Sequence, residues 1–160
     1  MDKKKLLEFI AKAHRNTYAA PKEIRQLHRC QVPILEGHKD YKFSDGDFSY
    51  HDSYAGSVWA PGREVVFFQG KPIWCMAYQG KDNSNYSSEF YDTLGFPFLK
   101  KALMNFEDNM PFRGPKQFVE EDFKYTFKMK GDYDYFTAQE KIFYKGEIIF
   151  LQDVMGELVR

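Results

Sequence analysis

An internal repeat restricts the fold of this chain more than any other feature of its sequence. Residues 47–80 and 122–156 share residues at the same spacing in two blocks, with one extra residue between the blocks in the second copy. The shared residues of the first copy are Asp47, Phe48, Tyr50, Gly56, Glu64, Phe67, Gly70, Ile73 and Gly80. Their counterparts are Asp122, Phe123, Tyr125, Gly131, Glu140, Phe143, Gly146, Ile149 and Gly156. A repeat of this length predicts two copies of one supersecondary unit.

The hydrophobic pattern predicts a helix before each copy and strands within it. Apolar residues recur at helical spacing over 2–17 and 90–106, and Gly95 and Pro97 are expected to split the second helix. Inside each copy the pattern changes to alternation, and Gly70 marks a hairpin turn. Strands are expected over 47–54, 64–68, 72–78, 123–129, 133–137, 141–144 and 148–154.

These elements predict an α+β fold. Two diverged helix-plus-β-meander repeats would form a mainly antiparallel sheet with the helices packed on it, because short connections favour antiparallel neighbours. The remaining segments are expected to be a long loop over 19–46, with one helical turn at 24–29, and a stiff loop over 109–115.

Length, charge and cysteine content restrict the class of protein. The chain of 160 residues fits one domain, residues 1–160. Its 23 basic and 23 acidic residues balance, so direct nucleic-acid binding is not expected. It contains no apolar run of about 20 residues, so no membrane contact is expected. Cys30 and Cys75 form no disulfide framework, which favours a reducing, cytoplasmic location.

The two copies differ at one position in a way that points to function. The expected inner face of the first strand reads Phe48, Tyr50, Asp52 and Tyr54, whereas Phe127 stands in the second copy where Asp52 stands in the first. An ionisable group in place of a phenyl ring lowers stability unless it is compensated. Asp52 therefore either hydrogen-bonds buried partners or lines a pocket.

Other residues of the first copy extend this candidate site. Aromatic residues make up 18% of the chain, and Trp59, Trp74 and Tyr78 fall in the same copy of the repeat as Asp52. Glu64 falls on an otherwise apolar strand face, as does Glu140 of the second copy, so each needs a partner or a wet cavity. Arg113 is a candidate partner. The predicted ligand-binding residues are Tyr50, Asp52, Tyr54, Trp59, Glu64, Trp74, Tyr78 and Arg113.

No motif of known chemistry accompanies these residues. The four histidines lack metal-ligand spacing, and the sequence has no nucleophile elbow, P-loop or dinucleotide fingerprint. We therefore predict no metal and no cofactor, and we leave open whether the chain is an enzyme.

Several segments resemble a bacterial family known only as a domain of unknown function. They are Asn16-Thr17-Tyr18-Ala19, the stretch from Gly46 to Gly56, the stretch from Gly70 to Gly80, and Pro111-Phe112-Arg113-Gly114-Pro115. The resemblance runs from about residue 6 to the C-terminus, although Leu151–Gly156 departs from the aromatic-rich ending of that family. It implies a domain that stands alone or follows a helix-turn-helix module. It implies no activity.

Three functional hypotheses follow. The first is a small-molecule-binding or sensory domain, and aromatic walls with carboxylates favour a cationic or aromatic ligand. The second is an enzyme that uses Asp52 or Glu64 as a general acid or base. The third is a protein-interaction module that uses exposed strand edges or the 109–115 loop.

Overall fold

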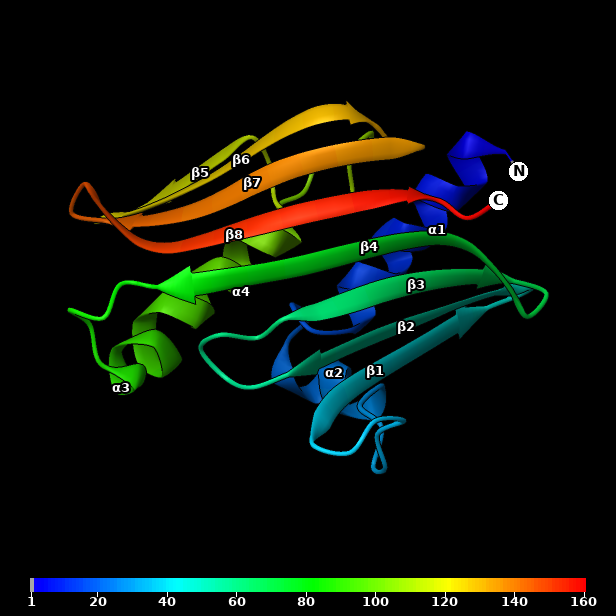
Figure 1. The fold of residues 1–160 in the computed structure, drawn as a ribbon, viewed down its shortest axis with the longest axis horizontal. Helices are drawn as coiled ribbons and strands as arrows, with labels where there is room; N and C mark the ends of the chain where they lie inside the picture. Colours follow the sequence, from blue (N-terminus) through cyan, green and yellow to red (C-terminus); the bar gives the residue numbers. More distant parts are fainter. Residues whose placement is uncertain (1) are drawn as a thin grey trace.

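The fold is built on one eight-stranded antiparallel sheet, in agreement with the predicted sheet (Figure 1). The computed structural model describes residues 2–160, and Met1 lies outside them. The strand order is β1-β2-β3-β4-β8-β7-β6-β5. The strands are β1 (His38–Asp45), β2 (Phe48–Ala55), β3 (Gly62–Phe68), β4 (Lys71–Asp82), β5 (Gln117–Glu120), β6 (Phe123–Asp132), β7 (Tyr135–Tyr144) and β8 (Glu147–Leu158). Antiparallel pairing between β4 and β8 joins the first four strands to the last four.

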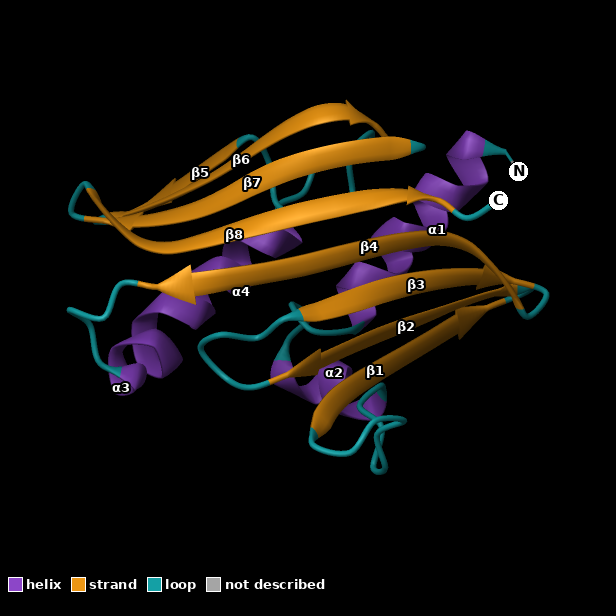
Figure 2. Cartoon of the chain, in the orientation of Figure 1, coloured by secondary structure: helices purple, strands orange, loops and turns teal. Residues whose placement is uncertain are grey.

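The helical segments lie on one side of this sheet (Figures 1 and 2). They are α1 (Lys3–Asn16), α2 (Lys22–Leu27), α3 (Ser88–Phe90), the π-helical turn η1 (Tyr91–Gly95) and α4 (Phe96–Met104). The ring of Phe9 in α1 stacks on Phe48 of β2 at 4.9 Å between centroids. The ring of Phe98 in α4 stacks on Phe123 of β6 at 5.0 Å. Aromatic pairs therefore connect both long helices to the sheet.

Residues at the expected positions form the helix ends and hairpin turns. The Asp2 side chain accepts a hydrogen bond from the Lys4 amide and caps α1, and the Ser87 side chain accepts one from the Phe90 amide and caps α3. Gln69 and Gly70 both have positive φ, at 49° and 77°. Positive φ at both central residues is typical of the type I′ turn, whose twist matches that of antiparallel strands. The predicted hairpin is therefore confirmed.

Two strands were missed because both lie at the edges of the sheet. Residues 38–45 form β1, so the predicted loop over 19–46 is wrong in its last part, and Gln117–Glu120 form β5. Lys39, Asp40 and Lys42 interrupt the apolar alternation of β1. Charged residues are common on edge strands because they discourage further pairing, and they also hide the strand pattern. The two strands predicted over 133–137 and 141–144 are one, β7.

The segment from residue 88 to 104 is helical without the predicted split. The amide of Phe96 donates to the Tyr91 carbonyl, a bond that spans five residues and closes the π-helical turn. Pro97 lies in the first turn of α4, directly after the π-helical turn, and has no amide hydrogen to donate to that turn. Gly95 and Pro97 therefore mark a change of helix type rather than a break.

Candidate functional site

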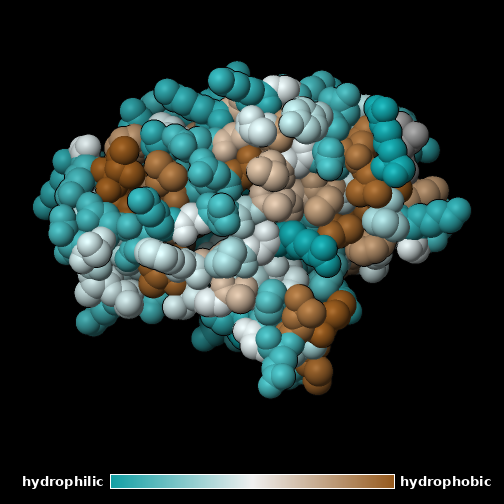
Figure 3. All heavy atoms as spheres, viewed as in Figure 1, coloured by the Kyte–Doolittle hydropathy of each residue, from teal (hydrophilic) through white to brown (hydrophobic). Residues whose placement is uncertain are grey.

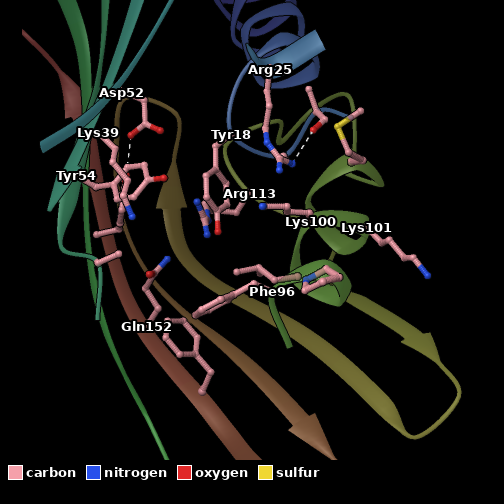
Figure 4. Close-up of a pocket in the computed structure, with 18 of the residues that line it drawn as sticks. Tyr18, Arg25, Lys39, Asp52, Tyr54, Phe96, Lys100, Lys101, Arg113 and Gln152 are labelled. Carbon is pink, nitrogen blue, oxygen red and sulfur yellow. Dashed lines mark hydrogen bonds between the residues drawn. The ribbon is translucent and has the colours of Figure 1, made fainter. Parts of the chain in front are cut away.

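A cavity of about 800 Å³ opens to solvent beside the helices, on the side of the sheet that carries them (Figure 4). Aromatic rings form much of its wall, including the edge-to-face pair of Tyr18 and Tyr54 at 5.8 Å between centroids. The lining residues used below are Tyr18, Arg25, Lys39, Asp52, Tyr54, Ala60, Glu64, Tyr78, Phe96, Lys100, Lys101, Arg113 and Gln152. Cavities of this size commonly hold small organic molecules.

Two carboxylates from adjacent strands meet at the base of the cavity. Asp52 of β2 and Glu64 of β3 lie directly opposite each other in the strand register, and both are buried. Alternation along each strand places both side chains on the helix side of the sheet. The Tyr78 hydroxyl of β4 donates a hydrogen bond of 2.6 Å to Asp52 Oδ1. Asp52 therefore has a buried partner and also lines a pocket, so both alternatives raised by the sequence apply.

A buried ion pair lies next to these carboxylates. The Arg113 guanidinium donates to both Glu140 oxygens, from Nε at 3.0 Å and from Nη2 at 2.8 Å. The Tyr125 hydroxyl and the Gln152 amide donate to the same carboxylate at 2.6 Å and 3.2 Å. Within residues 2–160, no buried side-chain nitrogen or oxygen lacks a hydrogen-bond partner. Arg113 is thus the partner that the sequence required for Glu140.

Arg113 also approaches Glu64, and His14 of α1 completes the surroundings of that carboxylate. The distance from Arg113 Nη1 to Glu64 Oε1 is 3.9 Å, and His14 Nε2 lies 2.7 Å from Glu64 Oε2. Glu64 is therefore contacted from α1 and from the 109–115 loop at the same time.

Burial and neighbouring charges shift the pKa values of the ionisable groups at the bottom of the cavity. Burial raises the pKa of the Asp52 carboxyl well above its usual range, and the neighbouring Glu64 carboxylate raises it further. The Tyr78 hydrogen bond and the Arg113 charge lower that pKa only in part. Although burial opposes its charge, the Glu140 carboxylate raises the pKa of Arg113. The bottom of the cavity therefore favours the neutral form of the Asp52 carboxyl and the charged form of Arg113.

Five of the eight predicted site residues line the large cavity: Asp52, Tyr54, Glu64, Tyr78 and Arg113. Tyr50 instead lines a small adjoining cavity of about 20 Å³, which shares Glu64 and Arg113 with the large one.

The two tryptophans lie elsewhere, so their predicted place beside Asp52 is wrong. Trp74 is fully buried, stacks on Phe112 at 5.4 Å, and donates from Nε1 to the Tyr133 carbonyl at 3.0 Å. Trp59 is 60% exposed and donates from Nε1 to the Asp82 carboxylate. Strand alternation put Trp74 on the correct face of β4, but that position faces the apolar core between the sheet and the loop that carries Phe112.

Several cavity residues were not predicted from the sequence. His14, Tyr18, Arg25, Lys39, Lys100 and Gln152 come from segments read as a plain helix, a loop or ordinary core. One of them had a detectable signal, because the repeat aligns Gln152 with Met76. This is a second polar-for-apolar difference of the kind that identified Asp52.

Replacing Asp52 with Asn is expected to raise the free energy of unfolding at neutral pH by about 1 kcal/mol. Residues that serve function often lower stability, and replacing them commonly stabilises a protein. The amide keeps an oxygen that accepts from Tyr78 and removes the ionisable group. Because the folded-state pKa of Asp52 is raised, the folded protein keeps a proton that the unfolded chain releases above about pH 4. Wild-type stability should therefore decline as pH rises toward the folded-state pKa, and the variant should lack this contribution.

Urea unfolding of Asp52→Asn at several pH values measures this effect. Asp153→Asn, an exposed carboxyl on β8 that accepts from Gln139, is the matched control and should change stability by less than about 0.5 kcal/mol. A loss of stability for Asp52→Asn at neutral pH would contradict the protonated state inferred here.

Residues 2–160 contain no group of three or more His, Cys, Asp or Glu side chains placed to hold a metal ion. No helix in this part of the chain is long and apolar enough to cross a membrane.

Comparison with known proteins gives one match. The model of a family described as "Domain of unknown function (DUF5680)" matches residues 52–159, a segment that begins at Asp52 in β2 and includes every strand from β3 to β8. The chain matches no curated protein and no solved structure.

Proposed function

This chain belongs to the DUF5680 family of domains of unknown function, and we propose that it binds a small organic molecule in the cavity above Asp52 and Glu64. The observation that carries this proposal is a cavity of about 800 Å³ whose base contains buried, hydrogen-bonded ionisable groups. A pocket with apolar walls and a few convergent polar groups, one with a perturbed pKa, is typical of a ligand site.

The composition of the cavity indicates how such a ligand would sit. The Tyr18 and Tyr54 rings offer flat apolar contact, and Tyr78 and Gln152 offer hydrogen bonds deeper in the cavity. Protonated Asp52 can donate a hydrogen bond, and Glu64 accepts one or attracts a cation. The base therefore suits the aromatic or cationic group expected from the sequence. A sensory role, in which an attached DNA-binding module reads ligand occupancy, is part of the same proposal and rests on the family resemblance.

A thermal-shift screen against a metabolite library tests the proposal, because a ligand selective for the folded state raises the melting temperature. Hits should lose their effect in Ala60→Trp, which fills the cavity. They should keep it in Ala77→Trp, which adds the same ring to an exposed position on the opposite face of β4. If no hit depends on residue 60, the proposal fails.

Acid–base catalysis is a second candidate function, favoured by the unlike surroundings of the two carboxylates. Burial raises the pKa of Asp52, which accepts a hydrogen bond from Tyr78, whereas Glu64 contacts His14 and Arg113. Pairs of carboxyls in different environments often supply a general acid and a general base. Mass spectrometry of screened hits after incubation would detect turnover, and Asp52→Asn should abolish it while hits still bind.

The 109–115 loop, which the sequence suggested as a protein-interaction surface, gives little support to that role. Met110, Phe112 and Arg113 are at most 8% exposed, so the centre of the 109–115 loop is not available to a partner. Another segment is more exposed: Leu27, Val32, Ile34 and Leu35 are each more than half exposed, and Figure 3 shows apolar atoms where the chain projects below β1. No groove accompanies these residues in the described cavities.

We also propose that the two halves of the sheet arose from one duplicated unit. The strand order supports this, because β1–β4 and β5–β8 have mirrored orders. The turns at Gly70 and Gly146 have the same signs of φ, and register shifts occur at the aligned positions Val66/Phe67 and Ile142/Phe143. Where β4 meets β8, Met76 pairs with Gly156 and Gly80 pairs with Gln152. The repeat aligns Met76 with Gln152 and Gly80 with Gly156, so exchanging the two copies turns one of these pairs into the other, as a twofold relation requires.

A further inference from the structure

Three basic side chains from three separate elements surround the mouth of the cavity. Arg25 comes from α2, Lys39 from β1 and Lys100 from α4, and Figure 4 shows Arg25 and Lys100 directed toward the open centre. Across residues 2–160, none of the three forms a salt bridge with a carboxylate. Neighbouring Lys101 also lines the cavity but differs, because it pairs with Glu120.

The contacts that these three residues make leave their charges uncompensated. Arg25 donates from Nη1 to the Ala20 carbonyl at 3.3 Å, and Lys39 donates to the Gly56 carbonyl at 3.0 Å. Lys39 and Lys100 also lie over tyrosine rings, at 5.7 Å from Tyr54 and 5.0 Å from Tyr18. These contacts position the side chains, but each keeps hydrogen-bond donors free to bind an acceptor.

Their proximity is electrostatically unfavourable without an anion. Burial, together with the charges of Arg25 and Lys39, lowers the pKa of Lys100 to about 8, and Asp92 opposes this shift. Tyr18, on the remaining side, stays neutral because burial raises its pKa. Three cations gathered against a common opening are the arrangement expected around a bound oxyanion.

We propose that Arg25, Lys39 and Lys100 bind an oxyanion, a carboxylate or a phosphate, carried by the ligand of this cavity. The inference rests on the proposed small-molecule function and specifies the class of ligand. The anionic group would lie at the mouth, the body against Tyr18 and Tyr54, and a hydrogen-bonding or cationic end at Asp52 and Glu64. To the cationic or aromatic ligand expected from the sequence, this proposal adds an anionic group.

NMR titration of the ¹⁵N-labelled chain tests this assignment with three probes: benzoate, benzyl alcohol and inorganic sulfate. Benzoate and sulfate are expected to cause saturable amide shifts in residues 18–25, 39–41 and 96–101. Benzoate should bind at least about tenfold more tightly than benzyl alcohol, since a charge-assisted contact of about 1.4 kcal/mol corresponds to that ratio. Sulfate probes the oxyanion contacts alone, and adding inorganic phosphate as a separate arm distinguishes a phosphate group from a carboxylate.

Lys100→Gln and Lys5→Gln form the matched pair of variants. The first should weaken benzoate and sulfate binding about tenfold, and the second should leave both unchanged because Lys5 is an exposed residue of α1 that lines neither cavity. If benzyl alcohol binds in the cavity as well as benzoate does and Lys100→Gln changes neither, the oxyanion site is wrong while small-molecule binding stands. If no probe shifts the cavity amides, both proposals lose their support.

The pH dependence of sulfate binding gives a second readout, because sulfate keeps its charge across the neutral and alkaline range. Anion binding requires protonated Lys100, so affinity should fall as pH rises through about 8. Lys100→Arg should restore binding and remove this pH dependence, since arginine stays protonated there. A wild-type profile that is flat between about pH 6.5 and 9.5 would overturn the role of Lys100.

Discussion

Replacing Arg113 with Met should lower the free energy of unfolding by about 3–5 kcal/mol, the usual effect of removing one partner of a buried ion pair. Glu140 is completely buried, and without Arg113 its charge would keep only the hydrogen bonds from Tyr125 and Gln152. Glu64 would lose the same nearby cation. The loss comes mainly from leaving carboxylates buried without a counter-charge rather than from the strength of the pair itself.

Urea unfolding of Arg113→Met, Glu140→Gln and the double variant measures this coupling. The double variant should lose less free energy of unfolding than the two single variants lose together, because Gln carries no charge and still accepts a hydrogen bond from Tyr125. Lys101→Met breaks an exposed pair with Glu120 and should lose less than about 1 kcal/mol. Additive losses, or a loss below about 1 kcal/mol for Arg113→Met, would show that the pair does not stabilise the centre of the sheet.

Replacing Phe127 with Asp should destabilise the chain by at least about 4 kcal/mol, which is exceptional for one substitution. Phe127 is 2% exposed and lies directly opposite Glu140 in the register of β6 and β7. The substitution would remove a ring from the core and place a second carboxylate beside Glu140, with Arg113 already bonded to the first. The aligned position in the first copy, Asp52, tolerates a carboxyl because Tyr78 and the cavity adjoin it.

Chemical denaturation monitored by circular dichroism compares Phe127→Asp with Phe127→Leu. The leucine variant keeps an apolar side chain and should lose about 1–2 kcal/mol, whereas the aspartate variant should be largely unfolded or close to it. Stability within about 1 kcal/mol of wild type for Phe127→Asp would mean that this part of the second copy admits water, and the contrast with Asp52 would lose its meaning.

Much of the fold was predictable because its determinants are local. The apolar stripe of α1, the caps at Asp2 and Ser87, and the turn at Gln69–Gly70 each depend on residues within a few positions of one another. Edge strand β1 was not predicted because its charged residues break the alternation that identifies a strand. The burial of residues 110–114 was not predicted either, because a segment rich in proline and glycine reads as a surface loop.

The candidate site divides in the same way. The sequence by itself determined that Asp52, Glu64 and Tyr78 each lie on the mainly apolar face of their own strand, because side chains alternate along a strand whatever surrounds it. It also determined that Glu140 needs a buried partner, because a carboxylate on an apolar face has no other means of compensation. Only the tertiary structure decided that Trp74 fills the core, that Arg113 bonds Glu140, and that Arg25, Lys39 and Lys100 meet at one opening. Those contacts join residues far apart in the chain, and the burial and electric field that give them their chemistry exist only once the helices lie on the sheet.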